Sequence, residues 1–278
     1  MIGACARATC NGADTTPTDF NEALMDTVAG KRATFRRMHE QGFFLLPNAW
    51  DRGSAVRLAA MGFEAIASTS SGAAWAAGRE DGELSLDEVL EHLRLLAASV
   101  PVPVNADFEN GFADAPDAMA RNVARAVDTG IAALSIEDWS GSAMYDASLA
   151  VERLQAAREA IDAIDPTVML VGRNENFRVP GMTATESIAR AVAYAGAGAD
   201  CLFVPMLLDS GAVSELVAAV APKPVNVVLQ AFDDSVPRLA DLGVRRCSTG
   251  GGLARRAWNA FDEAARSLRR LEQQVRSS

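Results

Sequence analysis

The feature that most constrains this chain is a regular alternation of short apolar runs with longer helical stretches. Most of the apolar runs are continuous rather than alternating, and many are β-branched. Continuous apolar runs are typical of strands that are covered on both faces, as in parallel sheets. The runs are 43–48, 64–69, 102–107, 132–138, 168–173, 201–206, 224–229 and 244–249.

Helix-forming sequences separate these runs. In residues 84–100, Ser85 is followed three positions later by Glu88, which predicts a capping box at a helix start. Residues 117–130 and 187–200 have helical spacing and carry glycine near their ends, a helix stop signal. Eight repeats of strand and helix predict a (β/α)8 barrel with parallel strands. A doubly wound open sheet is the structural alternative.

The chain is expected to form one domain. No linker, low-complexity block or charge run divides it after Asp19, so we predict a flexible tail over 1–20 and a single barrel domain over 21–278. The net charge is −10 and the positive charges are scattered, which argues against nucleic acid and an anionic membrane surface as partners. No apolar run is long enough to cross a bilayer.

The cysteine spacing matches no zinc or redox motif. Cys201 and Cys247 lie in or next to apolar runs, which predicts buried free thiols. Cys5 and Cys10 lie in an N-terminal segment without the pattern of a signal peptide. We therefore expect a reducing, cytoplasmic location.

Acidic residues gather at the carboxyl ends of the predicted strands, where a barrel carries its function. Asp107, Glu109 and Glu137 are expected to converge there, with Glu175 as a fourth candidate. Several carboxylates cannot share a small site as unpaired ions without a cation. Oxygen ligands without His or Cys favour Mg²⁺, or alternatively Mn²⁺.

Other residues at the same ends suit an anionic ligand. Arg173 offers a fixed positive fork to a carboxylate or phosphate, and residues 68–71 offer hydroxyls and backbone N–H groups to an oxyanion. His39 and His92 lie on helical stretches away from these ends, so we interpret them as surface or packing residues. The site suits a small, acidic, metal-chelating substrate such as a 2-oxo acid or its enolate. The predicted substrate-binding residues are Asn48, Trp50, Ser68, Thr69, Ser70 and Asn226.

Five segments at the predicted strand ends resemble, in the same order, segments of the isocitrate lyase/phosphoenolpyruvate mutase superfamily. The resemblance runs from about Phe43 to about Ala254, and the segments are spaced as barrel strands are. Singly each motif is weak, but their order is specific. The segments are PNAWD (47–51), STSSGAAWAAGREDGE (68–83), NADFENGF (105–112), SIED (135–138) and VGRNENF (171–177).

The resemblance implies a Mg²⁺-dependent barrel that stabilises a pyruvate-like enolate. By likeness, Asp107 would bind the metal directly, Glu109 would act through water and Glu137 would complete the metal shell. Arg173 would be catalytic, and the turn at 68–70 would bind the substrate carboxylate. Within the segment 68–83, Asp81 of residues 78–81 corresponds to the family's mobile-loop aspartate and would close over the site. The resemblance also implies a dimer or tetramer in which subunits exchange the last helix.

The loop after the fourth strand departs from the family. Lyases that cleave isocitrate or methylisocitrate carry Lys-Lys-Cys-Gly-His there, whereas residues 139–146 contain no Lys, Cys or His. The Lys and Asn of the phosphonate-cleaving and mutase branches are also missing. In addition, Glu109 stands where the family usually has Asp. The chain therefore resembles the branch that includes oxaloacetate decarboxylases, with water or Tyr145 expected to protonate the enolate.

The sequence thus predicts a Mg²⁺-dependent lyase that cleaves a carbon–carbon bond of a small 2-oxo or 2-hydroxy di- or tricarboxylic acid. One alternative is phosphonopyruvate hydrolysis or phosphorus–carbon chemistry of the mutase type. Another is a non-catalytic barrel that binds 2-oxo acids. The glycines at 250–252, after the last strand, are interpreted as a place of tight packing rather than a phosphate site.

Overall fold

The computed structural model describes residues 27–277. The predicted tail, Cys5 and Cys10 lie outside these residues. Every strand is parallel to its neighbours in one sheet of order β1-β9-β8-β7-β6-β5-β4-β3-β2. The strands are β1 (Phe44–Leu46), β2 (Asn48–Ala49), β3 (Ile66–Ser68), β4 (Val104–Asp107), β5 (Ala133–Glu137), β6 (Met169–Arg173), β7 (Cys201–Phe203), β8 (Val225–Val228) and β9 (Arg246–Ser248).

The sheet closes on itself at Pro47. Only this residue separates β1 from β2, and these two strands are the two ends of the sheet order. Proline has no N–H to donate to a ladder, so the first strand is interrupted there. Because β1 pairs with β9 while β2 pairs with β3, one interrupted strand joins both ends of the sheet. The predicted barrel is confirmed, and the open doubly wound sheet is excluded.

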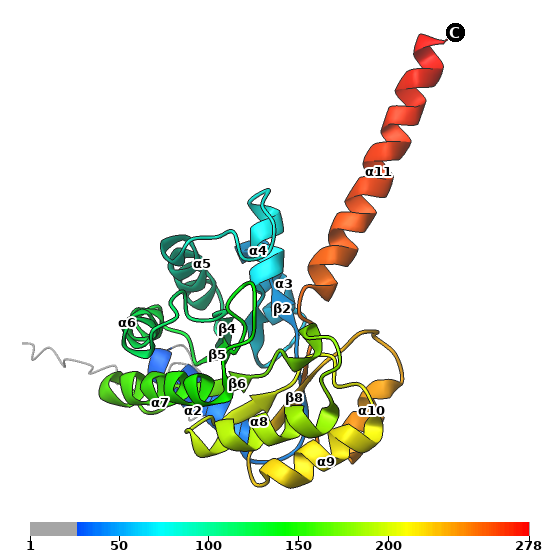
Figure 1. The fold of residues 1–278 in the computed structure, drawn as a ribbon. Coiled ribbons are helices and arrows are strands. Elements are labelled where there is room, and N and C mark those ends of the chain that lie inside the picture. Colours follow the sequence, from blue (N-terminus) through cyan, green and yellow to red (C-terminus); the bar gives the residue numbers. More distant parts are fainter. Residues whose placement is uncertain (1–26, 278) are drawn as a thin grey trace, which may run out of the picture.

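Helices surround the strands (Figure 1). The capping box at Ser85 forms as predicted: its hydroxyl accepts from the backbone N–H of Glu88, whose carboxylate accepts from the N–H of Ser85. The helical elements are α2 (Val28–Glu40), α3 (Arg52–Ala60), α4 (Ser70–Ala76), α5 (Leu86–Ser99), α6 (Pro116–Val127), α7 (Ala147–Ile164), the 3-10 helix η1 (Asn176–Arg178), α8 (Ala184–Gly196), α9 (Ser210–Val220), α10 (Ser235–Asp241) and α11 (Gly252–Arg276).

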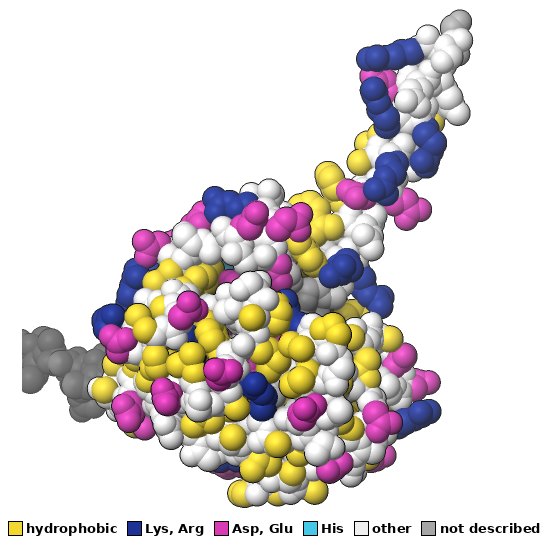
Figure 2. Space-filling model, in the orientation of Figure 1, with side chains coloured by type: hydrophobic (Ala, Val, Ile, Leu, Met, Phe, Trp, Pro, Cys, Tyr) yellow, Lys and Arg dark blue, Asp and Glu magenta, His cyan; other side chains and the backbone are white. Residues whose placement is uncertain are grey.

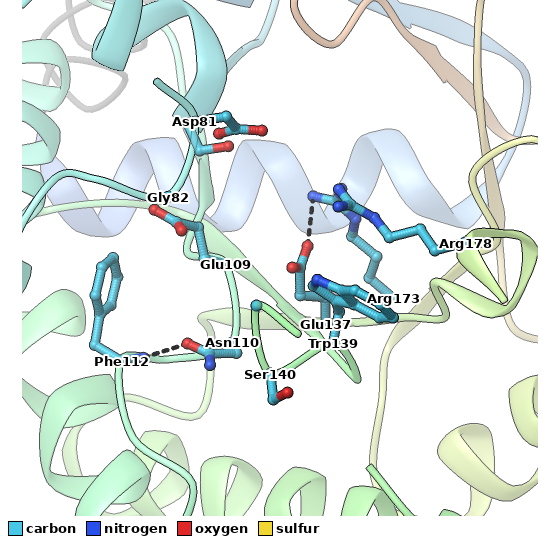
Figure 3. Close-up of a pocket in the computed structure, with 12 residues that line it drawn as sticks. Asp81, Gly82, Glu109, Asn110, Phe112, Glu137, Trp139, Ser140, Arg173 and Arg178 are labelled. Atoms are coloured by element: carbon cyan, nitrogen blue, oxygen red, sulfur yellow. Dashed lines mark hydrogen bonds and ion pairs between the residues drawn. The ribbon is translucent and has the colours of Figure 1, made fainter. Parts of the chain in front are cut away.

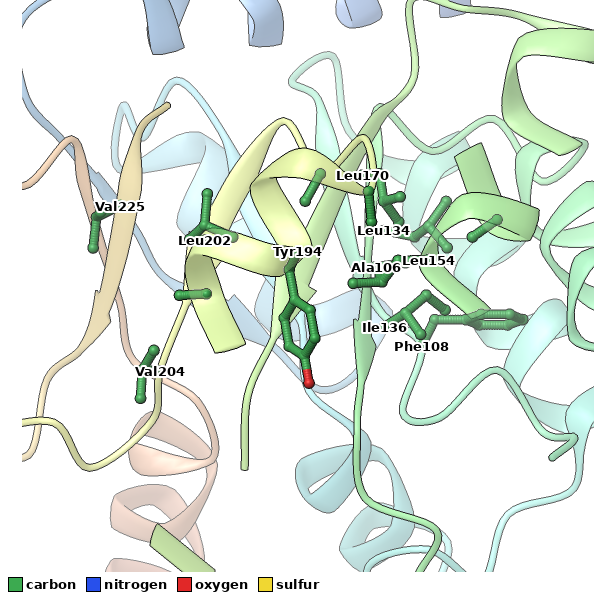
Figure 4. Close-up of a cluster of buried hydrophobic side chains, with 14 of the residues drawn as sticks. Ala106, Phe108, Leu134, Ile136, Leu154, Leu170, Tyr194, Leu202, Val204 and Val225 are labelled. Carbon is green, nitrogen blue, oxygen red and sulfur yellow. The ribbon is translucent and has the colours of Figure 1, made fainter. Parts of the chain in front are cut away.

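The largest hydrophobic core lies between the outer face of the strands and the helices (Figure 4). Alternate residues of one strand point to opposite faces. On β4, Ala106 belongs to this core, whereas Asn105 and Asp107 line a cavity inside the barrel. The barrel interior is therefore polar towards its carboxyl end. Core residues labelled in Figure 4 include Ala106, Phe108, Leu134, Ile136, Leu154, Leu170, Tyr194 and Leu202.

Cys201 and Cys247 are buried free thiols, as predicted. Within residues 27–277, no helix is both long and apolar enough to cross a membrane. Charges of both signs are scattered over the face of the barrel in Figure 2.

Helix α11 projects away from the barrel (Figure 1). Its large apolar side chains recur at helical spacing and are exposed in the single chain, with Phe261 at 62% and Val275 at 77%. Apolar residues spaced in this way form a stripe along one face of a helix. The stripe consists of Trp258, Phe261, Leu268, Leu271 and Val275.

Candidate active site at the carboxyl end of the barrel

Two adjoining cavities lie at the carboxyl ends of the strands. The outer cavity, of about 210 Å³, is lined by residues that include Glu109, Glu137, Trp139 and Arg178. The inner cavity, of about 140 Å³, extends into the barrel. Ser70, Asp81 and Arg173 line both cavities, so the two share a wall. The polar residues that line the inner cavity include Asn48, Ser68, Thr69, Asn105, Asp107, Ser135, Asn226, Arg246 and Ser248.

Asp107, at the end of β4, is held by three contacts. Its Oδ1 lies 3.0 Å from Arg173 Nη1, and its Oδ2 accepts from the backbone N–H of Ser70 at 3.0 Å. Its own N–H donates to Ser68 Oγ at 2.8 Å. Adjacent barrel strands thus place the predicted metal ligand against the predicted substrate turn.

Arg173, at the end of β6, is surrounded by carboxylates. Its Nη1 lies 3.0 Å from Asp107 Oδ1 and 3.2 Å from Glu137 Oε2, and its Nε donates to Glu175 Oε1 at 2.5 Å. Burial alone would lower the pKa of Arg173, but the charges of Glu137, Glu175 and Asp107 raise it above its ordinary value. The guanidinium is therefore a permanent cation in the wall that the two cavities share. Figure 3 shows Arg173 next to Glu137 at the outer cavity.

Glu109 and Phe112, which both line the outer cavity, have backbone φ angles in the left-handed region, and Phe112 has a φ of 60°. Glu109 has a φ of 48°, in a region that non-glycine residues seldom adopt. The carbonyl of Glu109 accepts from the N–H of Glu137 at 2.9 Å, which ties the ends of β4 and β5 together. The Glu109 carboxylate lies beside Gly82 and Asp81 at the outer cavity (Figure 3).

The carboxylates of the site crowd one another. Burial, followed by the charges of Asp107, Asp81 and Glu137, raises the pKa of Glu109 to about 8. Burial also raises the pKa of Glu137 to about 7, with Arg173 opposing the effect and the charges of Glu175 and Asp107 adding to it. For Asp81, burial is the main cause of a raised pKa, and a hydrogen bond from Ser70 opposes it.

The donor chemistry of the site fits a divalent cation. Two guanidiniums, of Arg173 and Arg178, face five carboxylates, so negative charge is in excess. A bound dication would favour the ionised forms that crowding disfavours. In the part of the chain that the structure describes, no three acidic, His or Cys side chains are already gathered as a ligand set. Arg173 instead holds Asp107 and Glu137.

The predicted substrate residues are only partly brought together. Ser68, Thr69, Ser70 and Asn226 line the inner cavity. Asn48 also lines it, but its amide is used within the fold: Nδ2 donates to the carbonyl of Ser68, and Oδ1 accepts from Thr249 and Gly250 N–H groups.

Trp50 and Tyr145 are not among the residues that line either cavity. The N–H of Trp50 donates to Ser54 Oγ, where α3 begins. The hydroxyl of Tyr145 donates to Asp114 and accepts from Asn110 Nδ2 at 3.2 Å. Burial, together with the Asp114 hydrogen bond, raises the pKa of Tyr145 to about 12.

Sequence reasoning missed two arginines at the site. Arg178, on η1, reaches the outer cavity, where its Nε donates to Glu175 at 2.8 Å and its guanidinium lies 5.5 Å from the centre of the Trp139 ring. Arg246, on β9, lines the inner cavity. Arg178 follows the family-like segment directly, which was a usable signal. The tandem of Arg245 and Arg246 gave no indication that one of them points inward.

The chain matches the family model for phosphoenolpyruvate phosphomutase over residues 35–269. It is 36% identical to an uncharacterized protein of Mycobacterium tuberculosis (strain ATCC 25618 / H37Rv), Rv1998c, over 88% of this chain and 92% of that protein. It is 33% identical to the 2-methylisocitrate lyase of Salmonella typhimurium, over 62% of this chain and 60% of that enzyme. A crystal structure from Burkholderia cenocepacia J2315, provisionally described as a lyase/mutase, has 40% identity and a TM-score of 0.84, covering 89% of this chain and 90% of that one. The chain therefore belongs to the phosphoenolpyruvate mutase/isocitrate lyase superfamily.

Proposed function

We propose that this protein is a Mg²⁺-dependent lyase that cleaves a carbon–carbon bond of a small 2-oxo or 2-hydroxy di- or tricarboxylic acid through a pyruvate-like enolate. The observation that carries the proposal is the arrangement of Asp107, Glu109 and Glu137 around Arg173 at the mouth of the barrel. An excess of buried carboxylates next to a fixed guanidinium suits a metal-chelating acid. Mn²⁺ has the same ligand preferences and is expected to substitute.

Asp107, Glu109 and Glu137 are the residues proposed to hold the metal, which when bound supplies Lewis-acid stabilisation of the enolate oxygen. Arg173 binds the substrate carboxylate and remains charged throughout, because its carboxylate neighbours keep its pKa high. The hydroxyls of residues 68–70 orient the same carboxylate from the inner cavity. Asp81 closes over the site from its loop and excludes bulk water.

The proton that ends the reaction is assigned to water in the outer cavity. The Tyr145 hydroxyl donates to Asp114, outside both cavities, and its raised pKa makes it a poor acid. The loop at 139–146 folds back through a bridge between Trp139 and Met144. It brings no Lys, Cys or His to the outer cavity, which favours a small substrate over isocitrate or methylisocitrate.

Phosphorus–carbon chemistry is the second candidate. Arg178 adds a second guanidinium to the outer cavity, and two guanidiniums suit a phosphonate dianion as well as a carboxylate. A non-catalytic barrel that binds 2-oxo acids would have the same site without turnover.

The test is pyruvate formation from a panel of 2-oxo and 2-hydroxy diacids that includes oxaloacetate, with Mg²⁺ and with chelator. Phosphate release from phosphonopyruvate is measured alongside. We expect chelator-sensitive turnover of one acid, lost in Asp107→Asn and kept in Asp117→Asn, a control at an exposed surface pair. Phosphate release without turnover of the other acids would establish the second candidate. Metal-dependent binding without turnover would establish a binding protein.

The exposed stripe of α11 supports a homodimer or homotetramer in which subunits exchange this helix. An apolar stripe this long is unfavourable in water, and a second copy of the chain offers a matching stripe. The cytoplasmic location stays a prediction.

A further inference from the structure

Arg246 is a buried cation inside the barrel. The residue is only 2% exposed and lies on β9 with its guanidinium at the inner cavity. Its Nε donates to Asn226 Oδ1 at 3.1 Å, and its Nη1 donates to Asn105 Oδ1 at 3.0 Å. The same Nη1 lies 3.2 Å from His39 Nε2.

All three of these partners are neutral. His39 Nδ1 lies 2.7 Å from the carbonyl of Phe35 and donates to it, so Nε2 is the acceptor for Arg246. Burial and the adjacent Arg246 charge lower the pKa of His39 to about 3, so the imidazole is uncharged near neutral pH. Within residues 27–277, Arg246 has no carboxylate within 4.0 Å.

A buried charge without a counter-ion is unfavourable unless its surroundings compensate it. Arg153, equally buried, shows one form of compensation, since the main-chain carbonyls of Asn110, Ala113 and Asp114 accept from it. Arg246 also has three neutral acceptors, but unlike Arg153 it lines a cavity of about 140 Å³, far more than one water needs. A guanidinium that adjoins open, polar space is a site for an anion.

The position of this site relative to Arg173 and Asp107 suggests which anion it binds. Asn105 precedes Asp107 by two residues on β4, and Arg246 precedes Ser248 by two on β9. At about 3.3 Å per residue, the floor of the inner cavity lies roughly 7 Å below Asp107 and Ser248. A short dicarboxylate with one end at Arg173 reaches this floor with its other end.

We propose that Arg246 forms a carboxylate subsite that binds the second carboxylate of the substrate, with the amide oxygens of Asn105 and Asn226 holding the guanidinium in place. The inference rests on the proposed function, because the first carboxylate is placed by Arg173 and the predicted metal set. It adds that the substrate is a short dicarboxylic acid lying along the barrel axis, and that a monocarboxylic acid of equal length is rejected.

The test compares malate with 2-hydroxybutyrate, which has the same four-carbon chain but a methyl group in place of the second carboxylate. Calorimetric dissociation constants are measured in Mg²⁺ at constant ionic strength. We expect malate to bind at least 30-fold more tightly to the wild type. The ratio is expected to fall below 3-fold in Arg246→Met, to be partly kept in Arg246→Lys, and to be unchanged in Arg245→Met, a control at the preceding residue.

If the wild type binds malate and 2-hydroxybutyrate with nearly equal dissociation constants, the inference is overturned. This result needs no variant, so the inference can be refuted even if Arg246→Met does not fold. A preference that is lost in Arg178→Met but kept in Arg246→Met would place the second carboxylate in the outer cavity and also overturn it. If sulfate binds to the wild type but not to Arg246→Met, and malate is not preferred over 2-hydroxybutyrate, Arg246 binds a free inorganic anion. This result would also contradict the proposal.

Failure of the inference is distinguishable from failure of the proposed function. Chelator-sensitive turnover that is indifferent to Arg246→Met would keep the lyase and remove the subsite. A malate preference that depends on Arg246, without turnover of any acid, would keep the subsite and remove the lyase.

Discussion

Replacing Arg153 with methionine tests whether a buried guanidinium holds the loop that carries Glu109. Arg153 extends from α7 to the carbonyls of Asn110, Ala113 and Asp114, and its guanidinium lies 4.2 Å from the centre of the Tyr145 ring. Methionine keeps the apolar stem but leaves these carbonyls without a donor. An unpaired buried acceptor costs about 1–3 kcal/mol, but these three bonds are only partly buried, so water relieves part of the cost and we expect a loss of about 4 kcal/mol in unfolding free energy.

Urea denaturation of the metal-free protein measures this loss. The comparison is valid when the wild type and the variant have similar m-values. Arg153→Lys is expected to lose about half as much, because one ammonium cannot satisfy the same three acceptors. The control Arg121→Met removes an exposed pair with Asp117 and should change stability by less than about 0.5 kcal/mol. A loss below about 1 kcal/mol in Arg153→Met would refute the reasoning, since the loop would then not depend on this side chain.

Three further predictions concern other parts of the chain. The pKa of His39 is lowered from 6.5 to about 3 on folding, so only the unfolded chain takes up its proton between these values and stability falls as pH drops below 6.5. Between pH 7 and pH 5, the unfolding free energy of His39→Gln should therefore fall by about 2 kcal/mol less than that of the wild type, as measured by urea denaturation at each pH. Equal decreases in the two proteins would contradict this. Ser85→Ala removes the cap of α5 and should lower unfolding free energy by about 1 kcal/mol, whereas Ser99→Ala, at the other end of the same helix, should change it by less than half as much. Removal of residues 265–278 should convert the oligomer into monomers in light scattering, and an unchanged mass would exclude exchange of the last helix.

The sequence was sufficient to predict the barrel, because each strand keeps an apolar outer face and each helix end carries its own signal. The segments around Asp107, Glu137 and Arg173 were predictable for a related reason, since the ends of parallel strands must meet at one rim. Side-chain direction within short runs was harder to predict. Asn105 and Arg246 point into the barrel and line the inner cavity. Their runs were treated as continuously apolar, so the direction of these two polar side chains was not predicted.

Residues in the loops were the least predictable. Trp50 follows Asn48 by only two positions, but the chain has already turned into the start of α3 there. Tyr145 is directed towards Asp114 by a loop that folds back on itself, which no local periodicity encodes. Arg178 depends on the turn made by η1 in the same way.

The interrupted first strand has a consequence for how the chain folds. Phe44 pairs with Arg246, and the Asn48 side chain accepts hydrogen bonds from Thr249 and Gly250, contacts between residues about two hundred positions apart. Contacts of such long range slow folding, because a large loop must be ordered before they form. During synthesis, the barrel cannot close until its last strand has left the ribosome. A nascent chain that ends before β9 has two unpaired sheet edges and lacks Arg246, so it has neither a closed barrel nor the proposed carboxylate subsite.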